Sequence, residues 1–87
     1  MSIYKVRENL VVEEIEDSVI IFDTDNERFF ELEGIGSFIW KNLDNKNFDE
    51  VVGTIRNEFD VDEETAGADT TDFIKSLLDN KLIVEFK

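Results

Sequence analysis

The stretch that decides the fold is ELEGIGSFIW, residues 31–40, where an aromatic-rich strand runs into a helix. Gly34 and Gly36 break the strand pattern, and Ser37, or a residue just before it, can begin the helix. Its apolar residues fall on one helical stripe: Ile35, Phe38, Ile39, Trp40 and Leu43. The sequence therefore predicts a junction between a strand and a helix near the middle of the chain.

Three short β-like runs lead up to this junction. They cover residues 10–15, 19–22 and 29–32, and they are rich in β-branched and aromatic side chains. Turns rich in Asp and Asn separate them, because these residues tolerate left-handed backbone and bond their own main chain. We expect a three-stranded antiparallel meander. An isolated meander is marginally stable, so the helices that follow must cover one of its faces.

Two further helices follow the junction. Asn47 is a plausible N-cap for a helix from Phe48 to Phe59, with acidic residues in the first turn and apolar residues on one face. A third helical segment begins beyond Asp62, but weak helix formers from Gly67 onward predict that the regular helix starts near Asp69. Residues 82–86 are apolar and predict a short final strand or an extended tail.

The order of these elements predicts one α+β domain over residues 1–87, winged helix-turn-helix-like, with a three-stranded antiparallel sheet followed by three helices. The chain has no Cys and no His, which leaves only carboxylates for chemistry. We therefore expect no enzyme activity, no metal and no cofactor. No apolar run approaches the roughly 20 residues that span a bilayer, and no signal-peptide pattern opens the chain. We expect a cytoplasmic protein with no membrane partner.

The charge balance bears on the choice of partner. Asp and Glu number 22 against 9 Lys and Arg, a formal net charge of −13, which repels polyanions at long range. Winged-helix domains commonly bind DNA, but a recognition helix needs Arg and Lys for phosphate contacts, and the second and third helices here are acidic. We expect no nucleic-acid partner. The charges either serve solubility alone or also steer a basic segment toward the domain.

Two other features have simpler interpretations than a site. The acidic runs at Glu13-Glu14 and at residues 62–64 suggest acid and base catalysis or a calcium site. General catalysis needs a pocket that shifts pKa values, and residues 23–34 do not reproduce the ligand spacing of a calcium loop. We interpret them as solvated turns and helix starts. The large aromatic residues of the helices are assigned to the core, because burial of each contributes about 1.5–3 kcal/mol: Phe38, Trp40, Phe48, Phe59 and Phe73.

The last strand of the meander has a different character. If strand order follows sequence order, this strand lies at a sheet edge with unpaired backbone groups, and such an edge is either protected or used. Its adjacent aromatic residues, Phe29 and Phe30, point to opposite faces, so one enters the core and the other borders a groove. A peptide could add there as a further strand. The residues of this edge are Arg28, Phe29, Phe30, Glu31 and Leu32.

The whole pattern resembles the PqqD-type family of peptide chaperones, also called RiPP recognition elements. The resemblance rests on the Phe-rich strand and the helix with Trp40, on a second helix ending Glu58-Phe59, and on a third helix leading into Leu82-Ile83. It implies that the leader segment of a ribosomal precursor peptide binds as an added strand, in a cleft with the third helix. Steps of three and four define the corresponding face of that helix: Asp69, Asp72, Phe73, Ser76 and Leu77.

The chain departs from the family pattern at two places. Glu33 stands where an Asn often follows the Leu of the strand, and Asn80-Lys81 replaces a Gly before the final apolar pair. The resemblance implies a precursor leader as ligand and a separate modifying enzyme, either a radical SAM maturase or a leader peptidase. The alternative hypothesis is an acidic structural or regulatory adaptor that binds a folded protein. Phe73 and Leu77 also fit a core role, and Asp69 or Asp72 could complement the helix N-terminus.

Overall fold

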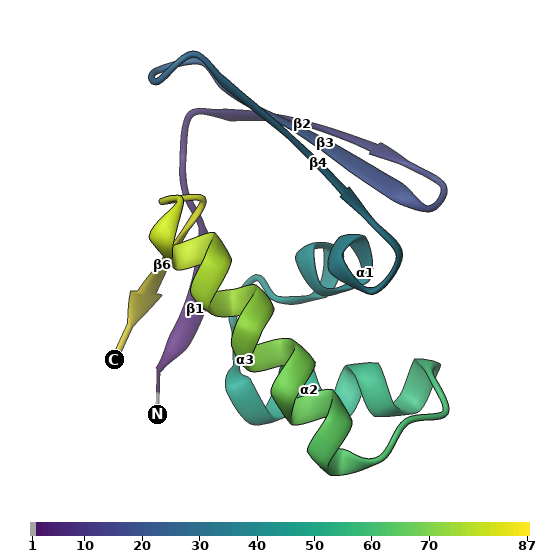
Figure 1. Ribbon diagram of the computed structural model, residues 1–87. Helices are drawn as coiled ribbons and strands as arrows, with labels where there is room; N and C mark the ends of the chain where they lie inside the picture. Colours follow the sequence, from purple (N-terminus) through teal and green to yellow (C-terminus); the bar gives the residue numbers. More distant parts are fainter. Residues whose placement is uncertain (1) are drawn as a thin grey trace.

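The computed structural model describes residues 2–87 and arranges them as two small sheets and three helices (Figure 1). The elements follow in this order: β1 (Ile3–Val6), β2 (Leu10–Ile15), β3 (Ser18–Asp23), β4 (Arg28–Glu33), α1 (Gly34–Asn42), β5 (Lys46–Asn47), α2 (Phe48–Glu58), α3 (Glu63–Asp79) and β6 (Ile83–Phe86). The predicted α+β, winged helix-turn-helix-like class is confirmed.

The predicted meander is the β2-β3-β4 sheet, with the strands in sequence order and antiparallel. Val19 and Ile21 of β3 have no exposed surface, so alternate residues of the central strand face the helices. In Figure 1 this sheet lies at the top of the molecule, with α1 directly beneath it. Helix α1 thus supplies the cover that an isolated meander needs.

The second sheet, in the order β5-β1-β6, brings the two ends of the chain together. Tyr4 pairs with Lys46 on one side and with Glu85 on the other. The final segment is therefore a strand and not an extended tail. Strands β1 and β5 were not predicted, because β5 has only two residues and neither shows an alternating pattern long enough to recognise.

Helix starts follow capping chemistry in two cases out of three. At α2, Asn47 and Glu50 form the predicted cap as a reciprocal pair: the Glu50 N–H donates to Asn47 Oδ1 at 2.9 Å, and the Asn47 N–H donates to Glu50 Oε1 at 3.0 Å. Helix α1 begins at Gly34 without a side-chain cap, earlier than Ser37. Gly34 has a φ of 57°, a conformation in which glycine is favoured.

The late start predicted for α3 is wrong. The helix begins at Glu63, where the Thr65 N–H donates to Asp62 Oδ1 at 2.7 Å. Ala66 and Thr70 are fully buried, so packing against the core outweighs the weak helix propensity of this first half. The Thr70 hydroxyl donates to the Ala66 carbonyl at 2.7 Å, which satisfies a polar group that has no access to water.

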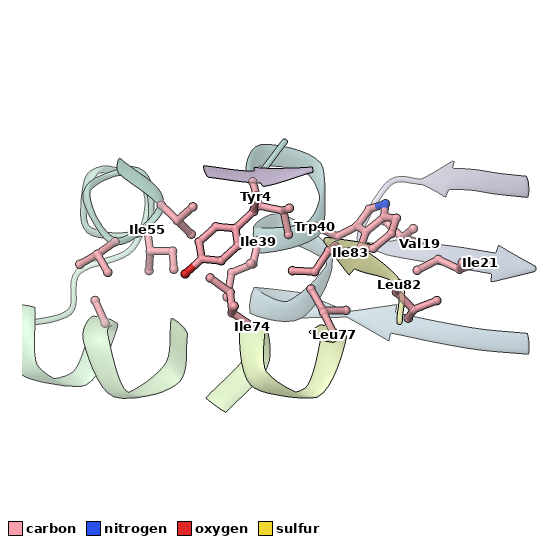
Figure 2. Packing of buried hydrophobic residues seen from close by; sticks show 14 residues of the cluster. Tyr4, Val19, Ile21, Ile39, Trp40, Ile55, Ile74, Leu77, Leu82 and Ile83 are labelled. Atoms are coloured by element: carbon pink, nitrogen blue, oxygen red, sulfur yellow. The ribbon is translucent and has the colours of Figure 1, made fainter. Parts of the chain in front are cut away.

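The core lies where α1, α2, α3 and both sheets meet, and Trp40 is 4% exposed within it (Figure 2). The predicted core role of the aromatic residues is confirmed, since Phe38, Phe48, Phe59 and Phe73 are half-buried against this cluster. The rings of Phe38 and Phe59 pack edge to face with centroids 5.2 Å apart. Within residues 2–87, no helix is long and apolar enough to cross a membrane.

Candidate functional site: an open sheet edge beside an apolar groove

Strand β4 is an edge strand, because among the described strands it pairs with β3 alone. Phe29 is 57% exposed on the outer face of the sheet, whereas Phe30 and Leu32 are half-buried against the core. The expectation that Phe29 and Phe30 point to opposite faces is confirmed. The edge thus presents an exposed backbone whose alternate side chains face either solvent or the helices.

The register identifies which backbone amides of β4 are free. Ile15 pairs with Ser18 across a two-residue turn, and such a closing pair exchanges both backbone hydrogen bonds. Successive residues of β3 direct their backbone hydrogen bonds alternately to β2 and to β4, so Ile21 bonds to Phe30. The amides on either side of Phe30 are then directed away from the sheet. The N–H groups of Phe29 and Glu31 are therefore the donors that an added strand would meet.

Arg28 fixes the start of this edge to the end of α3. Its Nη2 donates to Asp23 Oδ2 at 2.7 Å and to the Asn80 carbonyl at 2.7 Å. Its guanidinium also lies 5.1 Å from the centroid of the Phe30 ring, within the range of a cation–π contact. One side chain therefore connects β3, β4 and the C-terminus of α3, which holds the edge strand at a fixed distance from the helix.

Asp23 is the centre of this connection, and no pattern in the sequence had pointed to it. Its side chain has no exposed surface, and its Oδ1 lies 2.7 Å from Arg7 Nη2. The hydrogen bond from Arg28, followed by those from Asn26 and Arg7, holds the pKa of Asp23 well below its usual range, against the opposing effect of burial. Arg7 Nε also donates to the Lys81 carbonyl at 2.7 Å. The buried carboxylate thus has a structural role.

A groove of about 300 Å³ lies between α1 and α3. Its floor is apolar, and its rim carries two carboxylates and a hydroxyl from α3, all three exposed. The lining residues are Ile35, Gly36, Ile39, Asp69, Asp72, Phe73 and Ser76. Such a surface suits an apolar side chain that is followed or preceded by a basic one.

Gly36 allows the two walls of the groove to approach. A Cβ atom at this position would lie 2.9 Å from Cε1 of Phe73, closer than side chains pack. From the sequence, Gly36 was interpreted only as a strand breaker, and Ile35 and Ile39 were placed on a core stripe. The missed signal was a glycine inside the first turn of a helix, where close packing is the usual reason for its presence.

The structure brings together four of the five helix residues predicted for the site: Asp69, Asp72, Phe73 and Ser76 line the groove. Leu77 does not join them. It is 2% exposed and packs in the core, as Figure 2 shows, because its position on α3 faces the other buried residues. The prediction of Leu77 as a groove contact needs correction. Residues 28–32 form the open edge that leads into α1, and they do not line the groove itself.

The acidic runs do not form a metal centre in the described part of the chain. No three carboxylates among residues 2–87 are grouped so that they could hold a metal ion. Hydrogen bonds from Thr65 lower the pKa of Asp62, which is the electrostatic signature of a helix cap. The candidate site is built from the open edge, the groove and the acidic surface.

These features define a small winged-helix-like domain whose exposed strand edge adjoins an apolar, acid-rimmed groove. The chain belongs to the family described as Coenzyme PQQ synthesis protein D (PqqD), whose model matches residues 18–83. The family resemblance seen in the sequence is confirmed. A search of curated proteins found no match.

Two solved structures share the fold over nearly the whole chain. One, described as TbiB1 in complex with the TbiA(beta) leader peptide, is 31% identical, has a TM-score of 0.84, and is matched over 91% of this chain and 93% of its own. The other, lasso peptide synthetase B1 complexed with the leader peptide, has a TM-score of 0.80 at 18% identity. That match covers 93% of this chain and 96% of the other, and at this identity it shows the fold alone.

Proposed function

We propose that this domain binds the leader segment of a ribosomally synthesised precursor peptide and presents the precursor to a separate modifying enzyme or leader peptidase. The leader adds to the sheet as a strand along β4, with main-chain bonds to the outward amides of Phe29 and Glu31. Its inward side chains reach the groove between α1 and α3. Arg28, Phe30 and Leu32 complete the contact from the strand side.

The observation that carries this proposal is that the open β4 edge leads directly into α1, which forms one wall of the groove. An exposed edge alone is a liability that proteins normally protect. Here the register directs the amides of Phe29 and Glu31 outward, and the strand continues into α1, one wall of the apolar groove. The chain that carries this combination belongs to the PqqD family, and it is 31% identical to a protein solved with a leader peptide.

The proposed role is binding without chemistry. The chain contains no Cys or His, so a nucleophile and base pair of the usual kinds is not available. The precursor is made on the ribosome, and the proposed function therefore places the domain in the cytoplasm. The partner enzyme, a radical SAM maturase or a leader peptidase, supplies the reaction.

The test is a titration with the leader segment of a precursor peptide identified among the neighbouring genes, labelled for fluorescence anisotropy. We expect saturable binding of the leader and no binding of a scrambled peptide with the same composition. Mass spectrometry of the peptide after incubation with the domain alone should show an unchanged mass. Equal affinity for the scrambled peptide would leave the adaptor hypothesis as the better one, and a cleaved or modified peptide would show that the domain is an enzyme.

A further inference from the structure

The outer face of the β2-β3-β4 sheet carries exposed apolar side chains that the proposed leader site does not use. The pairing places Val11, Phe22 and Phe29 in one row across the three strands. Their exposed fractions are 56%, 40% and 57%. Figure 1 shows α1 beneath the opposite face of this sheet and no described element above the outer face.

These side chains form a preformed patch. The rings of Phe22 and Phe29 pack edge to face with centroids 5.2 Å apart, so their geometry is fixed before any partner arrives. Ile20 of the central strand lies in the next row on the same face. A contiguous apolar patch of this kind on a small domain is typical of an interaction site, because leaving it in water forfeits the free energy of burial.

Acidic residues border this patch. Glu13 and Glu31 flank Ile20 in the same cross-strand row, and Glu33 follows on β4. All three are exposed, and the chain as a whole carries a formal charge of −13. A second copy of this chain is a poor occupant, because a twofold interface would place these acidic borders against each other. The complementary surface has an apolar centre bordered by Lys or Arg.

The patch is continuous with the proposed leader site through β4. Phe29 and Glu31 present their side chains on the outer face, while their amides point away from β3 at the open edge. A leader strand added at this edge would extend the same sheet, so every second leader side chain would stand beside Phe29 and Glu31. The outer face of the domain and that of the bound leader then form one surface.

We propose that this outer face, centred on Val11, Phe22 and Phe29, docks the enzyme that modifies or cleaves the precursor, through an apolar spot with a basic border on that enzyme. The inference rests on the proposed function, since the leader strand forms part of the surface. It explains how the domain can hold a leader and deliver it: one face of the sheet receives the enzyme, while the leader pairs with the open edge of β4.

The test uses two purified probes, the leader segment and a modifying enzyme or peptidase identified among the neighbouring genes. The variant Val11→Thr/Phe22→Thr removes the apolar patch away from β4, and Thr is well accepted in strands. We expect its affinity for the leader to stay within about threefold of the unmodified domain. Its affinity for the enzyme, measured with the leader bound, should fall by about tenfold or more.

A pair of charge variants provides the matched control. Glu13→Lys and Glu14→Lys change the net charge equally on neighbouring residues of β2, but the two side chains lie on opposite faces of the strand. Glu13→Lys places a cation within the proposed interface and should weaken enzyme binding several-fold more than Glu14→Lys. Equal effects of the two would show that only the overall charge matters and would overturn the assignment of the face.

Four other outcomes would also decide against the proposal. Enzyme affinity unchanged in Val11→Thr/Phe22→Thr would place docking elsewhere. A concentration-dependent dimer of the unmodified domain, abolished in the same variant, would assign the face to a second copy. Failure of the unmodified domain to bind the leader would instead remove the proposed function, and with it the surface formed by the outer face and the bound leader. Leader binding without any enzyme binding would remove the docking inference alone.

Discussion

The two edges of the β2-β3-β4 sheet expose similar lengths of backbone, yet only β4 leads into a wall of the groove between α1 and α3. Strand β2 is exposed along most of its length and carries the adjacent charges Glu13 and Glu14, a common protection against unwanted strand pairing. Strand β4 is tied to α3 through Arg28 and leads directly into α1, which forms one wall of the groove. Open amides give affinity at either edge, and the groove between α1 and α3 adds specificity at β4.

The largest loss of stability is expected at Asp23, which anchors the start of β4 and the segment before β2. Asp23→Asn removes the buried charge that pairs with Arg7, just before β2, and with Arg28 at the start of β4. Because it leaves two cations without their shared carboxylate, it should lower the melting temperature more than an overpacking change such as Gly36→Ala. Thermal denaturation followed by circular dichroism measures this effect. An unchanged melting temperature would show that the cluster contributes nothing to the fold.

The same residue predicts a dependence on pH. The pKa of Asp23 is lowered in the folded state, so its stabilising contribution is complete above its usual unfolded value and is lost as the pH falls below about 4. The difference in stability between the unmodified domain and Asp23→Asn should therefore narrow on acidification from pH 6 to pH 3. A constant difference across this range would contradict a lowered pKa of Asp23 in the folded state.

The second prediction compares the two edges directly. Glu31→Pro and Glu14→Pro each replace an exposed residue whose amide points outward, a position that tolerates proline on an edge strand. Glu31→Pro removes a donor from the proposed peptide edge and places a ring in the path of the added strand. Leader affinity should fall by about tenfold or more in Glu31→Pro and change less than about twofold in Glu14→Pro. Equal losses would mean that the edges are not distinct.

The third prediction tests whether the groove distinguishes β4 from β2. Gly36→Ala adds a Cβ atom 2.9 Å from the Phe73 ring, and overpacking of this kind costs about 1–3 kcal/mol, against a gain of up to about 1 kcal/mol in helix propensity. We expect a net loss of about 1 kcal/mol in the free energy of unfolding, measured with urea, and a several-fold loss of leader affinity.

Gly53→Ala is the matched control for this change. Gly53 lies in α2, and a Cβ atom there meets nothing within 4 Å. This variant should be stabilised by up to about 1 kcal/mol through helix propensity, with leader affinity unchanged. If both variants gained stability and bound the leader equally well, the close approach of α1 and α3 would have no role in the groove.

The smallest effect concerns the acidic rim. Asp72→Ala removes an exposed carboxylate from the groove and should change the free energy of unfolding by less than about 0.5 kcal/mol. It should weaken binding of a leader with basic residues about two- to fourfold, an effect that disappears at high salt. Asp79→Ala, on the same helix but outside the groove lining, should bind the leader normally. Identical titration curves for the two variants would remove Asp72 from the site.

The elements of the fold that could be predicted from the sequence are those whose pattern lies within a short stretch of neighbouring residues. The meander and α2 were predictable because alternation, helical spacing and the Asn47 cap are contained in neighbouring residues. Strands β1 and β5 were not, because their pairing joins segments more than 40 residues apart. The early start of α3 escaped because burial of Ala66 and Thr70 is a tertiary effect that propensity does not contain.

The site was predictable in part for the same reason. Spacing placed Asp69, Asp72, Phe73 and Ser76 on one face, but it could not show that Leu77 lies in the core or that α1 supplies the opposite wall. The orientation of the amides also needed the register. Phe30 bonds to β3, so a proline there would damage the sheet, whereas Glu31 tests the open edge.

Amide hydrogen exchange of residues in β2 and β4, followed by NMR with and without the leader segment, is the sharpest test of strand addition at β4. If the leader pairs there, it should slow exchange at Phe29 and Glu31, whose amides point outward from β4, and leave Val12 and Glu14 on β2 unchanged. Protection at Val12 and Glu14, or none at Phe29 and Glu31 while the leader is bound, would contradict strand addition at β4.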